Sequence, residues 1–321
     1  MKIKHSNLLL LAAATIVVNS SAYAATAVKS NVAGTTELTS TAPSPSNAWT
    51  GGAGTNGSPA SGDIVSWNNT SLVGNQTISS AVTWDKMTFS GLTGALSIGG
   101  TGTITLNATG GNSNALDNNG AGQAVTISNN IILGYGKGSA TTLGETGNRV
   151  QLGISTANTN LILTGNVTSN GTAFVSDANV WLRGLSTGNR IDGTLTVDGQ
   201  LGKADVGTWT LNGINTIGRV FVNNGTLLAG SDQAFGAGTI YLSDNGQAQN
   251  PVIASKDSTA RTYANSLDLT VGTISNTLAF TGSTTASFGQ TSGGTGTQTF
   301  STDVNLGTSV RRITTHSATT F

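Results

Sequence analysis

Short alternating runs of apolar and polar residues follow one another along most of the chain, beginning near Trp49. Side chains alternate between the two faces of a β-strand, so each apolar pair with one residue between predicts a short strand with one buried face. The stretches between the runs, such as 107–111 and 222–225, are rich in asparagine and glycine and are typical of turns. The pattern predicts an all-β chain. The pairs are Leu96/Ile98, Ile104/Leu106, Val125/Ile127, Ile131/Leu133, Leu161/Leu163, Leu195/Val197, Trp209/Leu211, Val220/Val222, Ile240/Leu242 and Leu267/Leu269.

Two all-β architectures fit this pattern. Many short strands joined by turn residues are typical of a β-sandwich or another hairpin-rich fold. A solenoid instead repeats one kind of coil and covers the edge of each coil with the next. The chain keeps one texture over residues 49–321 and contains only 4 prolines in all. This uniformity favours a parallel β-helix, with the β-sandwich as the alternative.

The dipeptide Asn224-Gly225 distinguishes the two architectures. It lies between the apolar pairs Val220/Val222 and Leu227/Ala229, and Asn-Gly in such a place is a strong signal for a two-residue β-hairpin. The same dipeptide fits the corner of a solenoid, where one parallel strand bends into the next. A hairpin pairs 220–223 with 226–229 directly, whereas a corner pairs each stretch with a neighbouring coil. We expect the corner.

Three segments are expected along the chain. Residues 1–24 have the basic start, the apolar stretch and the Ala22-Tyr23-Ala24 site of a secretory signal peptide. Residues 25–48 are polar and include Pro43 and Pro45, which indicates a linker. Residues 49–321 form the β-helix.

Composition narrows the classes of function. Charged residues make up 9% of the chain, against about 25% in an average soluble domain. The formal net charge is zero, so there is no basic field to attract nucleic acid. The chain contains no cysteine, and the expected mature chain keeps one histidine, His316, with no plausible nucleophile beside it. A Ser/His/Asp site and metal sites built on cysteine and histidine are therefore not expected.

Residues 201–246 resemble a known repeat. A lead-in containing Lys203 precedes a Gly-Thr-x-Thr-Leu strand at 207–211 and a Gly-x-Asn-Thr link at 213–216. A Val-x-x-Gly-Thr-Leu strand pair at 222–227 and a Gly-x-Gly-Thr-x strand at 236–240 follow. This order resembles the autotransporter-associated β-strand repeat, with Trp209 as one of its mild departures. The tryptophan-rich stretch 49–67 also resembles the opening of many such passenger domains.

The resemblance implies a right-handed parallel β-helix passenger that is exported to the bacterial cell surface or outer membrane. It implies adhesion or cell-surface contact with a host-surface or carbohydrate ligand, and export through an outer-membrane translocator barrel. The stretch after Ser275 is too short for a membrane barrel of many strands. We therefore expect a passenger that is truncated at its C-terminus and lacks its barrel.

Clustered aspartates raise one enzymatic alternative. Secreted β-helices include polysaccharide-degrading enzymes, which place two or three aspartates beside arginine or lysine. Asp192, Asp198 and Asp205, near Arg183 and Arg190, supply these residue types. Within one extended strand the first two lie about 20 Å apart, so only neighbouring coils could bring the aspartates together. We expect turn aspartates, and no catalytic residues.

A calcium site is also not expected. Asp117, Asn119 and Gly122 occupy positions one, three and six of a loop-type calcium motif, but Ala121 and Ser128 stand where oxygen-rich ligands are needed. Residues 117–128 therefore indicate a turn, and we expect neither metal nor cofactor.

Rows of Thr-x-Thr suggest a third class of function, a threonine-ladder binding surface. Stacked in register on a flat face, such rows resemble those of ice-binding proteins. Threonine is also a strong strand former that tolerates exposure, and the irregular spacing of the rows argues against one aligned ladder. The rows are Thr101/Thr103/Thr105, Thr194/Thr196, Thr208/Thr210 and Thr297/Thr299.

Overall fold

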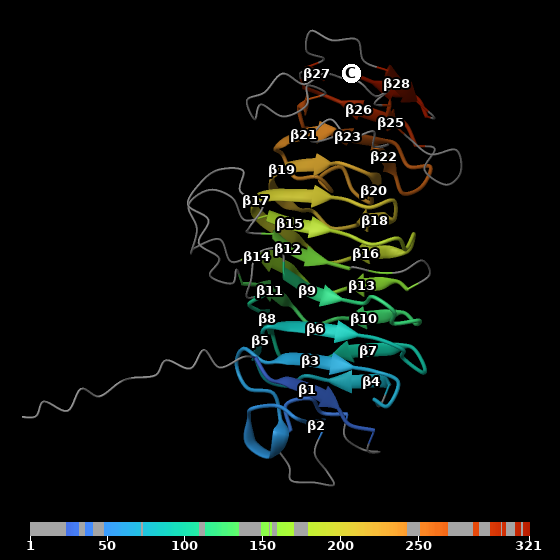
Figure 1. The fold of residues 1–321 in the computed structure, drawn as a ribbon. Coiled ribbons are helices and arrows are strands. Elements are labelled where there is room, and N and C mark those ends of the chain that lie inside the picture. Colours follow the sequence, from blue (N-terminus) through green and yellow to red (C-terminus); the bar gives the residue numbers. More distant parts are fainter. Residues whose placement is uncertain are drawn as a thin grey trace, which may run out of the picture.

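The computed structural model describes residues 24–31, 36–40, 48–71, 73–108, 113–134, 149–153, 155, 159–169, 179–242, 251–268, 285–288, 296–302, 304–305, 312–315 and 317–321. The expected signal peptide, apart from Ala24, lies outside these residues. Figure 1 shows short strands stacked as successive coils from the N-terminal to the C-terminal end. The neighbouring coils pair in parallel, so the chain is a parallel β-helix, as the uniform pattern predicted.

Most coils contribute strands to three faces. The first face consists of β1 (Thr26–Lys29), β3 (Ile64–Trp67), β6 (Lys86–Phe89), β9 (Ser113–Asp117), β12 (Arg149–Leu152), β15 (Asn179–Leu182), the second half of β17 (Leu195–Lys203), the second half of β19 (Thr216–Val222), β21 (Thr239–Leu242), β24 (Leu267–Asp268) and β27 (Val304–Asn305). At its start β2 (Trp49–Thr50) pairs antiparallel with β1, and a short 3-10 turn, η1 (Thr55–Gly57), follows.

The second face is a ten-stranded parallel sheet. It contains β4 (Gly74–Thr77), β7 (Leu96–Gly99), β10 (Val125–Ile127), β13 (Leu161–Leu163), β16 (Asn189–Ile191), β18 (Thr208–Leu211), β20 (Gly225–Ala229), β22 (Pro251–Ser255), β25 (Thr285–Phe288) and β28 (Arg312–Thr315).

The third face contains β5 (Val82–Trp84), β8 (Ile104–Leu106), β11 (Ile131–Leu133), β14 (Val167–Ser169) and the first halves of β17 and β19. A separate three-stranded sheet of β23 (Arg261–Tyr263), β26 (Gln298–Phe300) and β29 (Thr319–Thr320) lies in the C-terminal coils. Because β17 and β19 each bend across a corner, the first and third faces join into one continuous sheet there.

Asn224-Gly225 forms a corner between two faces. Val222 on β19 pairs with Lys203 and Leu242 of the adjacent coils, and Leu227 on β20 pairs with Trp209 and Ile253. The two strands therefore belong to different sheets, and the hairpin alternative is wrong. Gly225 has a positive φ of 71°, which explains why glycine follows the asparagine.

Alternate side chains fill the interior of the coil. Most strands bury every second residue; β8, β11 and β13 bury their first and third residues and turn the middle residue outward. At the N-terminal end the interior is aromatic, because Trp49 packs edge-on against Trp67 and Trp84 at 5.2 and 5.9 Å between ring centroids. Trp67 in turn stacks on Phe89 of the next coil. The apolar pairs of the sequence thus form one column-like core.

Buried asparagines close the corners. Asn215 accepts a hydrogen bond from the Leu195 backbone and donates one to the Ala234 carbonyl, at 2.8 and 2.7 Å. Asn129 and Asn265 donate to the carbonyls of glycines at comparable corners. These side chains satisfy backbone groups that the bend removes from the strand ladder.

Glycines at the corner between the second and third faces let the coils approach closely. A Cβ on Gly193 would lie 2.3 Å from the carbonyl oxygen of Gly165, and one on Gly213 would lie 2.4 Å from that of Gly193. Since these are backbone atoms, no side chain can move aside to relieve the clash.

Replacing Gly193 by alanine is expected to lower the free energy of unfolding by about 1–3 kcal/mol, the usual cost of overpacking. Gly94→Ala is the matched control, because its Cβ would meet only a valine methyl, at 3.3 Å. We expect the control to change the free energy of unfolding by less than about 0.5 kcal/mol. Equal losses in urea denaturation of the two variants would contradict the close-packing explanation.

Part of the expected linker belongs to the solenoid. Residues 26–29 form β1, which pairs in parallel with β3, and both Leu38 and Ala48 are buried. The polar composition of 25–48 concealed this strand. Its two buried residues are Ala27 and Lys29, and a lysine does not mark a buried position in the sequence. Among the described residues, no helix is long and apolar enough to cross a membrane.

Candidate functional site

The three aspartates of the enzymatic alternative occupy three different corners of the solenoid. Asp192 follows β16, Asp198 lies where β17 bends between faces, and Asp205 follows the end of β17. Asp192 is held by Arg190 at 2.9 Å and by Asn212 of the next coil at 2.6 Å. The aspartates therefore do not converge on one groove. Paired-carboxylate chemistry requires such convergence.

Asp205 instead joins neighbouring coils through Arg183. The guanidinium donates to both carboxylate oxygens, at 2.8 and 3.1 Å, and also to the side chain of Gln151 one coil further away at 2.6 Å. The backbone N–H of Gly184 donates a third bond to Asp205 at 2.8 Å. These bonds hold the pKa of Asp205 below its ordinary value, against the effect of desolvation. The cluster connects three coils at one corner.

Lys203 lies inside the same corner. It is fully buried and occupies an interior position that neighbouring coils fill with Leu182 and Val222. Its ammonium group donates to the carbonyls of Ala204, Asp205 and Asn224, at 2.6, 2.7 and 3.1 Å. Burial lowers the pKa of Lys203 to about 7, although the Asp205 carboxylate opposes this shift. Lys203 thus acts as an internal cap for the turn.

The calcium-like loop at Asp117 and the single histidine of the expected mature chain, His316, were the other candidate sites in the sequence. Asp117 accepts the backbone N–H of Asn119 at 3.0 Å and a bond from Asn114, as expected of a turn. No cluster of three or more potential metal ligands occurs within the described ranges. His316 lies outside them.

The threonine rows fall on different surfaces. Thr103/Thr105 and Thr194/Thr196 belong to the third face, Thr208/Thr210 to the second, and Thr299 to the three-stranded sheet. Thr101 is at a bend, where its hydroxyl donates to the Ser79 carbonyl. Only the third face therefore brings two of these rows onto one surface.

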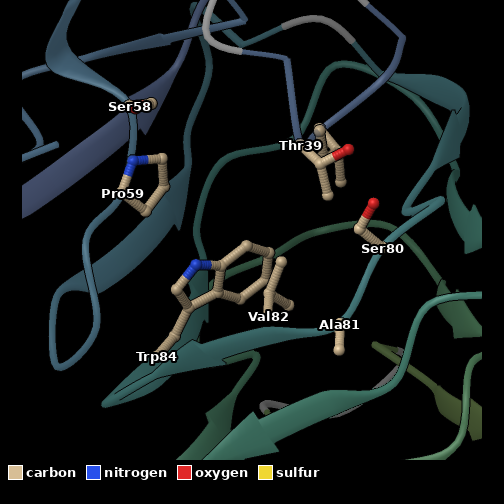
Figure 2. Close-up of a pocket in the computed structure, with 8 residues that line it drawn as sticks. Thr39, Ser58, Pro59, Ser80, Ala81, Val82 and Trp84 are labelled. Carbon is tan, nitrogen blue, oxygen red and sulfur yellow. The ribbon is translucent and has the colours of Figure 1, made fainter. Parts of the chain in front are cut away.

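A pocket of about 280 Å³ lies near the N-terminal end, beside β5. Figure 2 shows its lining, which combines the hydroxyl groups of Thr39, Ser58 and Ser80 with the apolar Pro59 and Val82. Trp84 also lines it but is 2% exposed, so its ring faces the core. None of the 8 lining residues is ionisable, so the pocket carries no acid or base of its own.

An aromatic column on the outer surface of the first face is the feature that the sequence analysis missed. Trp181, Phe221 and Tyr241 are the outward residues of β15, β19 and β21, with Gly202 in the intervening coil. Phe221 and Tyr241 stack at 4.6 Å between centroids, with 9° between their planes. The Trp181 ring lies across Gly202, where a Cβ would come within 2.6 Å of the ring.

A polar column runs beside the aromatic column. Gln200, Arg219 and Thr239 pair in register across three of its four coils, and each stands two residues before Gly202, Phe221 or Tyr241. Phe221 and Tyr241 are half-buried, as are the three polar residues beside them, and together they form one surface of aromatic and hydrogen-bonding side chains. Trp181 is only 6% exposed and adds little to that surface. The signal was present in the sequence, since 180–182, 220–222 and 240–242 each place an aromatic residue between two aliphatic ones.

Comparisons with protein-family models, with curated proteins and with solved structures found no match to this chain. Its function must therefore be inferred from the surfaces described above.

Proposed function

We propose that the protein is a non-catalytic passenger of the autotransporter type, exported to the cell surface, where its β-helix serves adhesion or cell-surface contact. The outer surface of the first face is the proposed contact surface, and a carbohydrate or host-surface molecule is the proposed ligand. Export through an outer-membrane translocator barrel is part of the same proposal, because it rests on the resemblance of residues 201–246 and on the signal-like residues 1–24.

The aromatic column is the observation that carries this proposal. Aromatic residues and arginine are enriched at the centres of protein recognition surfaces, where they supply most of the binding free energy. Phe221 and Tyr241 offer such groups beside Arg219, on a rigid sheet whose residues lose little further freedom on binding. A flat, continuous surface of this kind fits an extended ligand better than a small molecule.

The divergence of the acids supports the non-catalytic part. Asp192 and Asp205 each form an ion pair with an arginine at a corner, and Asp198 is exposed at a third corner. Asp205 joins coils through Arg183, and Asp192 does so through Asn212. Among the described residues neither aspartate faces a second carboxylate, which an acid and base pair requires.

The proposal is tested by probing the full chain on an array of glycans and on cultured host cells. We expect saturable binding by the original protein and a loss of about tenfold or more in the double variant Phe221→Ser/Tyr241→Ser, since hot-spot aromatics contribute about 2 kcal/mol or more each. Leu228→Ser is the matched control, because Leu228 is a half-buried outward residue on the second face.

Equal binding by the double variant and the original protein would reject the first face as the contact surface. If the original protein binds neither glycans nor cells, the adhesive function itself is wrong. Hydrolysis of any arrayed glycan by the purified chain would overturn the non-catalytic assignment.

A further inference from the structure

Residues of the third face form a regular outward column of threonines. Thr83 pairs with Thr105, Thr105 with Ile132, Ile132 with Thr168, Thr168 with Thr196 and Thr196 with Thr216, across six successive coils. Each of them lies between two residues that point into the core, so the column faces outward. We call this the threonine column; one isoleucine is its single departure. Three of its members, Thr83, Thr168 and Thr216, stand outside every Thr-x-Thr row of the sequence.

A second outward column runs parallel to the first. Thr103, Asn130, Asn166 and Thr194 each stand two residues before a member of the threonine column, and their carbonyls accept backbone bonds that join the successive coils. The side chain of Asn130 accepts the backbone N–H of Asn166, and that of Asn166 accepts the N–H of Thr194, both at 3.0 Å. These bonds fix the amide groups in one orientation, so the surface is ordered before any ligand arrives.

The two columns define a two-dimensional lattice. Neighbouring coils place equivalent side chains about 4.7–4.9 Å apart, and residues two apart in one strand are separated by about 6.5 Å. Neither column contains a charged residue, so no strongly hydrated group interrupts the lattice. Each threonine instead presents one methyl and one hydroxyl group in a χ1-restricted side chain. A lattice of such groups is complementary to a repeating array of water molecules.

We propose that this third-face surface binds ice. The repeat along each column is close to one oxygen repeat on a prism face of ice, so hydroxyl and amide groups can occupy successive water positions while the methyl groups fill the hollows between them. The argument depends on the register of the coils, and no register shift occurs among β5, β8, β11 and β14. The proposal is independent of the contact function of the first face.

Ice-affinity partitioning of the full chain tests the proposal. A slowly growing ice hemisphere excludes ordinary solutes, whereas an ice-binding protein is incorporated. We expect the original protein to be enriched in the ice fraction and Thr168→Lys to reduce that enrichment by about tenfold or more, the change expected when about 1.4 kcal/mol of binding free energy is lost. Thr168 is exposed near the middle of the column, so the long charged side chain would interrupt the lattice on both sides.

Thr126→Lys is the matched control. Thr126 is the outward residue of β10 on the second face, so the same charge is added to an equivalent strand on a different surface. We expect this variant to partition into ice like the original protein. Thr196→Lys repeats the test at a second lattice position if Thr168→Lys lowers solubility. Far-UV circular dichroism verifies the fold of each variant.

Exclusion of the original protein from ice would overturn the proposal, as would equal partitioning of Thr168→Lys and the control. Neither result bears on glycan or cell binding, which depends on the aromatic column of the first face. Conversely, a protein that enters ice but binds no glycan or cell would keep this inference and lose the proposed adhesive function.

Discussion

Replacing Trp209 by alanine is expected to lower the free energy of unfolding by about 3–5 kcal/mol, the range for removal of a large buried aromatic side chain. Trp209 is fully buried on β18, where it pairs with Asn189 and Leu227 of the adjacent coils. Its ring passes so close to Gly153 that a Cβ there would lie 2.5 Å away. Its indole N–H donates to the Arg183 carbonyl at 2.8 Å. The ring therefore connects the second face to the corner of the Arg183–Asp205 pair.

The size of this effect follows from where the ring points. In a solenoid each coil is stabilised mainly by its neighbours, so a cavity inside one coil also weakens the interfaces beside it. Urea denaturation followed by far-UV circular dichroism measures the loss. Phe221→Ala is the matched control, since it removes an aromatic ring of the neighbouring coil that points outward. A larger loss for Phe221→Ala than for Trp209→Ala would contradict the interior role of Trp209.

The strands and the corner were predictable because their signals are local. An apolar residue at every second position determines which side of a strand is buried, as in Ile104/Leu106 and Leu161/Leu163. For Asn224-Gly225, the dipeptide permits a sharp bend in either architecture. The same pattern of short apolar pairs and turn residues continues along the whole of residues 49–321. A solenoid repeats its coil in this way and a sandwich does not, so the pattern favoured the solenoid.

Single outward residues can be read from the alternation, but their alignment into surface columns was not predictable, because coil length varies. Leu201 pairs with Val220, and Val220 with Ile240, so these coils contain 19 and 20 residues. Leu152 pairs with Leu182, which gives a coil of 30 residues. Insertions at the corners account for the difference and hide the alignment of outward residues that are adjacent only in space. The repeat resemblance was clearest at 201–246, where the coils are short and regular.

The interior lysine escaped sequence reasoning for a different reason. A lysine in a turn-rich sequence normally indicates a solvated surface position. Lys203 stands at a position where alternation predicts an apolar residue, since Leu201 precedes it and both are buried. Two carbonyl groups of the turn that follows, and the Asn224 carbonyl of the next coil, point toward the interior, and the long Lys203 side chain donates to all three. Composition and spacing do not reveal that geometry.

Replacing Lys203 by methionine is expected to lower the free energy of unfolding by about 1–3 kcal/mol at neutral pH, because the three carbonyls lose their donor while the volume of the side chain is nearly kept. Lys256→Met is the control, since Lys256 is exposed and donates to Asn212 at the surface. We expect the control to change the free energy of unfolding by less than about 0.5 kcal/mol. Equal effects of the two substitutions would contradict the capping role.

The Lys203→Met variant should also change how stability depends on pH. The pKa of Lys203 is about 7 in the folded chain and 10.5 is its ordinary value, so between these values the unfolded chain binds more protons than the folded one. The free energy of unfolding of the original protein therefore rises with pH across this window. Above pH 10.5 Lys203 is neutral in both the folded and the unfolded chain, so this increase ends there. Lys29, whose pKa burial lowers to about 8, contributes in the same direction in both proteins. The measurement is the free energy of unfolding of variant and original protein, obtained by urea denaturation at each pH, and the difference between the two isolates Lys203. We expect the stability lost on substitution to grow from pH 7 to 10. A difference independent of pH would show that Lys203 keeps its proton when the protein folds.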